Sequence, residues 1–278
     1  MKKIINHLIQ LQELCFAYSE QEVLQAKDHL EQLQQSIHSL ENGLPEDLSA
    51  IFKKVSNHYK LAIVPMIKGV CRGCGVRLPI SMAQEVEQAE KIFQCPNCAR
   101  IIYPYEGDKV KFKLHKDKPD IIKLGVMRFS SVRLMKPSLG ANTKEEAIGE
   151  LAKLMVTQGF IEESKEFLEQ ALNREAMAST AVGSDLAFPH VRGVEGGGLT
   201  FAIGLKKNGI KFGASDGTLS RIIFFIIIPA AASSFYLTLL SGLIQSFRNP
   251  EVRKSMINSA TDKEMWLKLI KFTKDKIK

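Results

Sequence analysis

Four cysteines in two close pairs constrain the fold of this 278-residue chain more than any other feature. Cys71 and Cys74 are separated by two residues, Cys95 and Cys98 likewise, and twenty residues lie between the pairs. Two such CxxC turns can place four thiolates around one tetrahedral Zn²⁺ and complete its coordination. The spacing therefore predicts a structural zinc site, which leaves no ligand position for catalysis.

Two disulfides or four unrelated thiols are the alternatives to zinc. Residues 4–25 follow a basic Met1-Lys-Lys but are interrupted by His, Gln and Glu, so they lack the apolar core of a secretory signal. We therefore expect a cytoplasmic protein in a reducing compartment, where disulfides are rare. The fifth cysteine, Cys15, is expected to be a small apolar residue of a helix.

The first forty residues predict one long helix. Apolar residues recur there at intervals of three and four, the spacing of a coiled-coil seam: Val23, Ala26, Leu30, Leu33, Ile37 and Leu40. Asn42-Gly43 indicates the end of this helix, and Pro45 the start of a second one. The prediction for residues 1–66 is a helical hairpin or coiled coil. Its seam has two alternative partners, the chain's own second helix or a second copy in a homodimer.

The cysteine motifs CRGCGVRLP and QCPNCARIIY, placed after these helices, resemble the bacterial C4-type zinc-ribbon proteins with a helical hairpin. The resemblance covers residues 1–106, with the ribbon at 67–106. It implies a module that binds RNA or serves as a scaffold for other proteins. The second helix is shorter here than that family usually carries.

Positive charge is concentrated in two segments of a chain whose formal net charge is +8. Residues 107–137 hold nine Lys or Arg against three Asp, and residues 262–278 hold six Lys against three acids. Such stretches can meet nucleic acid, acidic proteins or membrane headgroups. The plainer interpretation, which we favour, is a solvated tail and a basic linker over residues 107–127.

Residues 222–247 carry no charge and are long enough to span a bilayer. The run is not uniform, because RIIFFIIIP is β-branched and aromatic and stops at Pro229, whereas the residues after it include Ser, Thr and Gln. We predict a buried central strand followed by a packed helix, and no membrane span.

An α/β pattern precedes this run. Thr143 is a predicted N-cap, with Glu145 and Glu146 in the first helical turn and Gly159 at the helix end. A second helix is expected over residues 162–173. The sequence thus predicts a mixed sheet flanked by helices for residues 128–278.

His190 is the only histidine after Asp120, in the apolar, strand-like segment LAFPH. Neutral imidazole is a competent nucleophile near pH 7, and a phosphoryl group bound to it would need donors and positive charge. Arg174 and the hydroxyl of Thr180 are candidates for those roles. The alternative is a packed core histidine, and the residues alone do not separate the two. No G-x-S-x-G elbow supports a serine hydrolase.

The segments NREAMAST, LAFPHVRGVEGGGLTFAIGL and IIFFIIIPAAASSFYLTLLSGL resemble the enzyme IIA domain of the phosphoenolpyruvate-dependent phosphotransferase system, of the fructose, mannitol and nitrogen-related type. The resemblance covers residues 128–278 and includes an arginine sixteen positions before the histidine. It implies that His190 accepts a phosphoryl group from the carrier HPr, or a paralogue, and that Arg174 steadies it. It also implies a IIB domain or a regulated protein as the next partner.

Tyr236 departs from that pattern. Transport members of the family carry a second histidine there, and this chain reads FYLTLL. A tyrosine can donate a hydrogen bond to phosphate, but it brings no positive charge at neutral pH. We therefore expect a regulatory phosphoryl carrier, an enzyme only in that sense, with the ribbon engaging a partner. The alternative is a phosphorylation-silent scaffold that binds nucleic acid or protein.

Overall fold

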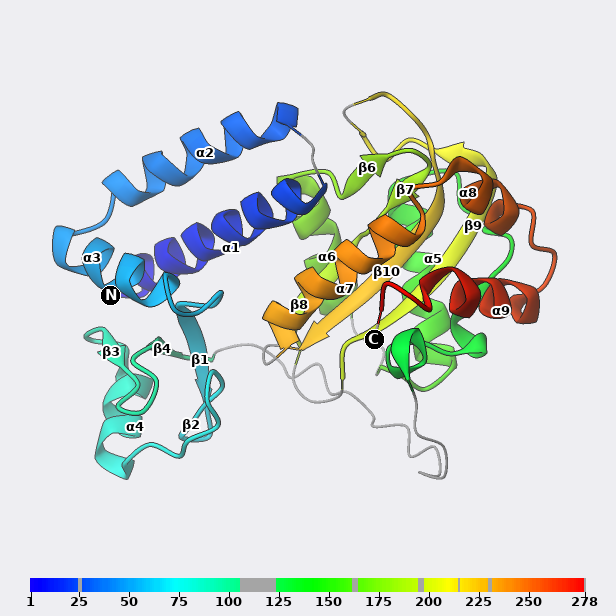
Figure 1. Ribbon diagram of the computed structural model, residues 1–278. Coiled ribbons are helices and arrows are strands. Elements are labelled where there is room, and N and C mark those ends of the chain that lie inside the picture. Colours follow the sequence, from blue (N-terminus) through cyan, green and yellow to red (C-terminus); the bar gives the residue numbers. More distant parts are fainter. Residues whose placement is uncertain are drawn as a thin grey trace. The chain divides into compact units, whose positions relative to one another are not determined.

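The computed structural model describes residues 1–24, 27–105, 124–161, 165–194, 198–214, 216–229 and 232–277. The chain forms two compact units, Met1–Glu22 with Lys27–Asp108, and Val23–Ala26 with Lys109–Lys278 (Figure 1). The basic linker expected at 107–127 lies mostly outside the described residues.

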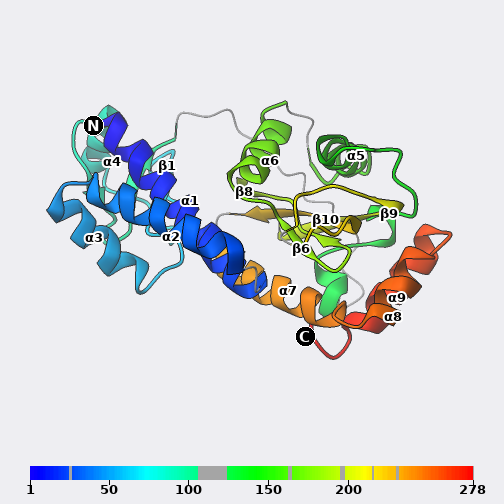
Figure 2. The ribbon, with the colours of Figure 1, turned by 90° about the horizontal axis from the view of Figure 1, so that it is seen from above.

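Three helices open the first unit: α1 (Lys2–Leu24), α2 (Lys27–Asn42) and α3 (Glu46–Ser56). The prediction of one helix over the first forty residues is wrong, because α2 runs back antiparallel to α1 (Figures 1 and 2). This return covers the C-terminal end of the apolar seam, since Ile37 and Leu40 pack on the core that contains Leu8 and Leu11. The ring nitrogen Nε2 of His7 also lies 2.8 Å from the Leu40 carbonyl oxygen. The hairpin is therefore formed by α1 and α2, which are the two halves of the single helix that was expected.

A small sheet and one helix complete this unit. The strands are β1 (Ile63–Ile67), β2 (Val70–Cys71), β3 (Phe93–Gln94) and β4 (Ile101–Pro104), in the order β2-β1-β4-β3, with α4 (Ile80–Gln88) between β2 and β3 in sequence. β1 and β4 are parallel, and the other two pairings are antiparallel. The side chain of Gln12 from α1 accepts from the Ile63 amide at 2.8 Å and donates to its carbonyl at 3.0 Å. This pairing attaches the hairpin to the ribbon through the backbone of β1.

The second unit contains a six-stranded mixed sheet, which confirms the predicted fold class. Its strands are β5 (Met135–Lys136), β6 (Ala181–Gly183), β7 (Leu186–Ala187), β8 (His190–Val194), β9 (Thr200–Ile210) and β10 (Ser220–Pro229). The order is β5-β9-β10-β7-β6, and β8 also pairs with β10. β10 is antiparallel to β9 and parallel to both β7 and β8.

Helices cover both faces of this sheet. Figure 2 shows α5 (Lys144–Thr157) and α6 (Lys165–Met177) on one face and α7 (Ser233–Ser246), α8 (Pro250–Ile257) and α9 (Asp262–Thr273) on the other. Two 3-10 turns, η1 (Gly125–Arg128) and η2 (Val132–Leu134), precede β5. Thr143 is the N-cap of α5, as predicted, and it also forms a reciprocal capping box with Glu146. Gly159 follows the helix with φ +74°.

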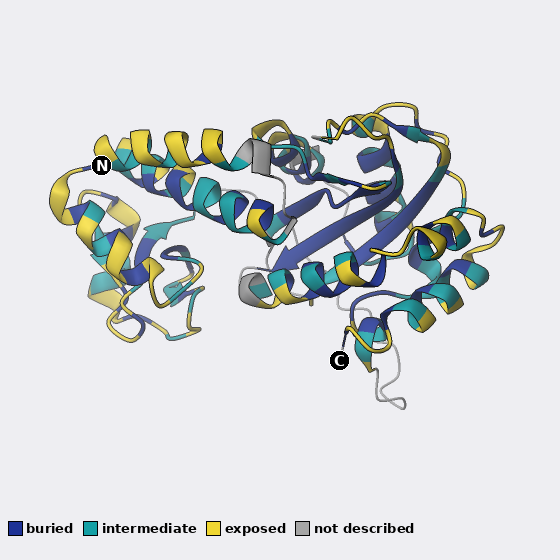
Figure 3. Cartoon of the chain, turned by 45° about the horizontal axis from the view of Figure 1, so that its top comes forward, coloured by how far each residue is buried: buried dark blue, intermediate teal, exposed yellow. Residues whose placement is uncertain are grey.

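The uncharged run of residues 222–247 forms β10 and α7, so the prediction of a strand followed by a helix is confirmed. β10 is buried because strands flank it on both edges and helices cover both faces (Figure 3). Within the described residues, no helix has both the length and the apolar character required to cross a membrane.

His190 begins a strand instead of ending one, which corrects the sequence interpretation of LAFPH. β7 pairs Leu186 with Ile222, and β8 pairs His190 with Ile226, so both short strands keep one register against β10. Pro189 lies between them and has no amide hydrogen for a ladder bond. The interruption at residues 188–189 therefore places His190 at the first position of β8.

Candidate functional site

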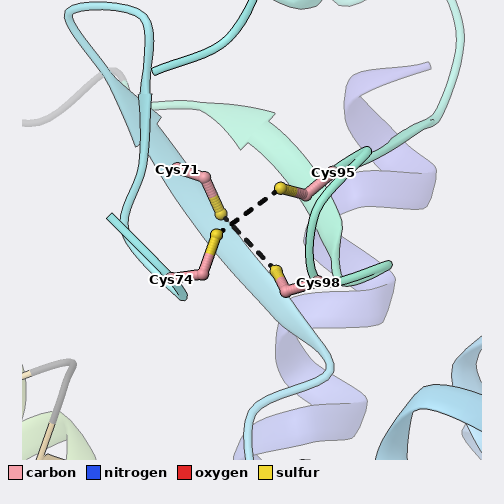
Figure 4. Close-up of side chains that lie close together, drawn as sticks. All are labelled: Cys71, Cys74, Cys95 and Cys98. Carbon is pink, nitrogen blue, oxygen red and sulfur yellow. Dashed lines mark hydrogen bonds between the residues drawn. The ribbon is translucent and has the colours of Figure 1, made fainter. Parts of the chain in front are cut away.

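The four cysteines of the ribbon converge on one point (Figure 4). All four Sγ atoms lie within 4.8 Å of one another, with Cys71 and Cys98 at 3.9 Å and Cys74 and Cys95 at 3.7 Å. A tetrahedral Zn²⁺ with Zn–S bonds of about 2.3 Å separates its sulfurs by about 3.8 Å. These distances fit zinc and are far too long for disulfide bonds of about 2.05 Å.

Each cysteine pair is held by the same backbone turn. Gly75 donates its amide to the Cys71 carbonyl at 2.8 Å, and Ala99 donates to the Cys95 carbonyl at 2.8 Å. Both residues have left-handed backbone angles, φ +77° at Gly75 and +59° at Ala99. The two CxxC segments are therefore equivalent knuckles, and each presents two sulfurs on one side of a tight loop.

The thiols of the cluster differ in how readily they ionise. Burial raises the pKa of Cys71 to about 12. For Cys74, burial also acts to raise the pKa, but hydrogen bonds from the Asn97 side chain and the Val76 amide outweigh it and lower the pKa to about 6. A bound metal cation would favour the thiolate at all four positions, with release of protons.

The second candidate site surrounds His190, which is 1% exposed at the start of β8. Its Nδ1 lies 3.0 Å from the carbonyl oxygen of Phe188. A carbonyl oxygen can only accept, so this contact assigns the ring hydrogen to Nδ1. In the neutral ring, the lone pair available for bond formation is then on Nε2.

Tyr236 from α7 contacts the same ring. Its Oη lies 3.3 Å from Nδ1 of His190, and the two ring centroids are 5.2 Å apart. The side chain of Tyr236 is 1% exposed. Tyr236, which was proposed for the site from sequence, thus touches His190 directly.

Arg174 and Thr180 lie at and beyond the C-terminal end of α6, which packs against β8. The Arg174 guanidinium donates from Nη1 to the carbonyl of Ala178 at 2.9 Å. The Thr180 hydroxyl donates to Oε2 of Glu175 at 2.5 Å. A hydroxyl has a single hydrogen, and in Thr180 that hydrogen is used by Glu175. The sequence had suggested this hydroxyl as a hydrogen-bond donor to the phosphoryl group, but here it has a structural role.

Glu175, the residue after Arg174, belongs to the surroundings of His190 and was not among the residues proposed from sequence. It is 3% exposed and accepts from both the amide and the hydroxyl of Thr180. Burial raises the pKa of its carboxyl group, against the opposing effects of the Thr180 bonds and of Arg174. No sequence signal marked it, because its partner is set by the loop that follows α6.

Two segments of the chain match known families. Residues 129–272 match the family described as "Phosphoenolpyruvate-dependent sugar phosphotransferase system, EIIA 2". Residues 70–102 match the C4-type zinc ribbon domain. Both regions agree with the resemblances seen in the sequence, and they contain His190 and the four cysteines.

Similar proteins carry EIIA domains. The chain is 32% identical over 117 residues to the fructose-specific EIIA component of Haloferax volcanii, covering 42% of this chain and 76% of that protein. It is 26% identical over 128 residues to the fructose-specific EIIABC component of Bacillus subtilis, covering 46% of this chain and only 20% of the longer protein. Among solved structures, IIA-Ntr of Neisseria meningitidis aligns with 22% identity and a TM-score of 0.47, covering 51% of this chain and 96% of that one.

The match spans more than half of the chain, and it contains His190, Arg174 and Tyr236. The protein therefore belongs to the EIIA 2 family of the phosphoenolpyruvate-dependent sugar phosphotransferase system, and it also carries a C4-type zinc ribbon.

Proposed function

We propose that His190 accepts a phosphoryl group on Nε2 from an HPr-like carrier protein. The observation that carries this proposal is the 3.0 Å contact between Nδ1 and the Phe188 carbonyl. It supports a tautomer in which Nδ1 holds the hydrogen and Nε2 holds the nucleophilic lone pair. A core histidine could have the same burial, but family membership makes this position the one to test first.

In the transfer step, the Nε2–P bond forms as the donor's bond to phosphorus breaks, and that bonding pair leaves with the donor. The hydrogen stays on Nδ1, so the phosphorylated ring becomes cationic. The bond from Nδ1 to the Phe188 carbonyl is then charge-assisted and stronger than in the neutral ring. Because His190 is 1% exposed, a donor protein reaches Nε2 only after the surrounding chain moves.

Arg174 and Tyr236 are proposed as supporting residues. The guanidinium of Arg174 supplies the positive charge that steadies the phosphoryl oxygens. Tyr236 packs against the ring and fixes its plane, without the titratable charge of a second histidine. The presence of a tyrosine in place of a second histidine supports a regulatory carrier whose phosphorylated state is recognised by a IIB domain or another target protein.

The ribbon is proposed to hold structural Zn²⁺ through Cys71, Cys74, Cys95 and Cys98, and to engage the partner. The sulfur spacing supports this assignment. The metal would cross-link the two knuckles and stabilise the ribbon fold, with no part in phosphoryl transfer.

The test is phosphate incorporation from phosphoenolpyruvate in the presence of enzyme I and HPr of the same organism. An acid-labile mass gain is expected on the wild-type chain and on His58→Ala, a control histidine in the first unit, but not on His190→Ala. Arg174→Ala should lower the rate by roughly 10²-fold, the usual cost of losing one charge-stabilising donor. If the wild-type chain stays unlabelled while another EIIA domain is labelled, the carrier function is wrong. The phosphorylation-silent scaffold that binds nucleic acid or protein is then the better explanation.

A further inference from the structure

We infer that Glu175 is a positioning residue for His190, which it reaches through a chain of hydrogen bonds over Thr180 and Phe188. This inference rests on the proposed function of His190 and deepens it. Glu175 acts on the backbone next to the imidazole. It fixes the backbone whose carbonyl selects the ring tautomer.

The first connection joins Glu175 to Thr180. The two carboxylate oxygens each lie 3.2 Å from the Thr180 amide nitrogen, and Oε2 lies 2.5 Å from the Thr180 hydroxyl. Thr180 is 2% exposed and Glu175 is 3% exposed, so no water competes strongly for these bonds. One side chain thus holds both the backbone and the side chain of Thr180.

The second connection joins Thr180 to Phe188. The amide of Phe188 donates to the Thr180 carbonyl at 3.0 Å. This bond extends the antiparallel pairing of β6 with β7, in which Ala181 lies opposite Ala187. The position of Thr180 therefore determines where residue 188 sits.

The third connection joins Phe188 to the ring, through the 3.0 Å contact of its carbonyl with Nδ1 of His190. On the other side, the Ile226 amide donates to the Pro189 carbonyl at 2.9 Å. Residues 188–190 are thus held from both sides, by Thr180 and by β10. Loss of either support would let the Phe188 carbonyl turn away from Nδ1.

Loss of the carboxylate would leave the buried amide and hydroxyl of Thr180 without their hydrogen-bond acceptor, which costs free energy. We expect the loop to shift so that these donors find other acceptors. A shifted Phe188 carbonyl no longer holds the hydrogen on Nδ1, and the Nε2–H tautomer gains population. In that tautomer Nε2 has no lone pair for phosphorus. We expect phosphoryl transfer to slow by about 10- to 100-fold, the scale on which small misplacements of a reacting group act.

The direct test is the imidazole tautomer in the unphosphorylated full chain, observed by long-range proton–nitrogen NMR of His190. Wild type should show the Nδ1–H form. Thr180→Ser retains the hydroxyl and should match it, whereas Thr180→Val and Glu175→Ala should show a mixture. Glu146→Ala, which breaks the capping box of α5 instead, is the matched control and should leave the tautomer unchanged.

Phosphorylation rates of the same variants give the second readout. Thr180→Val should be slow and Thr180→Ser near wild type, so the pair remains informative even where Glu175→Ala folds poorly. An unchanged Nδ1–H tautomer in folded Thr180→Val and Glu175→Ala would overturn the inference. If wild type is never phosphorylated although these variants do change the tautomer, the proposed function fails and the positioning role stands.

Discussion

The residue that follows each cysteine pair adopts a left-handed backbone conformation, but one of these residues is a glycine and the other an alanine. Gly75 has φ +77° and no atom within 4 Å of where a Cβ would lie, whereas Ala99 keeps a side chain at φ +59°. A residue with a Cβ is disfavoured in this region by about 1–2 kcal/mol, and glycine is not. Ala99 is therefore a strained position within an otherwise repeated turn.

Exchanging the residue types at these positions should shift the stability of the ribbon in opposite directions. Ala99→Gly is expected to stabilise it by up to about 1 kcal/mol, because the relief of strain exceeds the added chain entropy of glycine. Gly75→Ala should destabilise it by about 1–2 kcal/mol. Denaturant unfolding of the zinc-loaded chain measures both. If Gly75→Ala instead stabilises the ribbon, the left-handed backbone conformation at residue 75 does not limit the stability of this turn.

The two sites differ in how far single residues could be assigned from sequence. The cysteine ligands are set by local spacing, so Cys71 and its partners could be identified without a fold. His190 and Arg174 could be named as candidates from residue type, but only the family resemblance favoured a functional histidine over a packed core histidine. The roles of Phe188 and Glu175 could not be predicted, because they depend on the pairing of β6 with β7 and on a backbone carbonyl, which no residue type encodes.

At the scale of elements, α5 shows a helix start that is fully specified by sequence. The Thr143 hydroxyl accepts from the Glu146 amide at 3.2 Å, and the Glu146 carboxylate accepts from the amides of Asn142 and Thr143 at 2.7 and 3.3 Å. These reciprocal bonds satisfy donors that a helix leaves unpaired at its first turn. The helix therefore begins at Lys144 for reasons contained in the five consecutive residues Asn142 to Glu146.

The capping box makes part of the stability of the second unit dependent on pH. Hydrogen bonds from the amides of Asn142 and Thr143 hold the pKa of Glu146 below its ordinary value. Because the folded pKa lies below the unfolded value of about 4.3, the stabilisation is present above that pH and is lost as pH falls through the folded value.

Thermal unfolding of wild type and Glu146→Gln should therefore differ at neutral pH and converge in acid. Glu145→Gln, on the same turn but outside the box, is the control and should remain close to wild type throughout. A difference between wild type and Glu146→Gln that persists in strong acid would contradict a role for the ionised carboxylate.

Other elements were less predictable because their ends depend on tertiary partners. The apolar spacing of residues 23–40 is continuous, yet α1 ends at Leu24 and α2 begins at Lys27. The spacing indicates only that one face of the helix is apolar. That face can be buried equally well when α2 folds back on α1. LAFPH similarly looked like one strand, and the proline within it separates β7 from β8 on a shared register.

At the scale of the whole molecule, the chain consists of two units with separate cores. In the first unit one cluster joins the helices to β1 and β4, and a second surrounds the cysteines. The second unit is built around β10, which has no fully exposed residue along its length. The ribbon core is small, and we therefore expect a bound metal to contribute much of its stability.

Zinc removal should accordingly affect the two units differently. A chelator is expected to unfold the ribbon and to leave phosphorylation of His190 intact, as followed by circular dichroism and phosphate incorporation on the same sample. Roughly one Zn²⁺ per chain should be found in wild type and in Cys15→Ser, and little in Cys95→Ser. Loss of phosphorylation on chelation, with the second unit still folded, would show that the ribbon takes part in the transfer.

The most direct measurement of the central claim is phosphorus NMR of the phosphorylated chain, which distinguishes the two ring nitrogens of a phosphohistidine. The geometry of Nδ1 against the Phe188 carbonyl predicts a single resonance from phosphate on Nε2 of His190, absent from His190→Ala. A resonance from phosphate on Nδ1, or one that survives in His190→Ala, would contradict the account of this site.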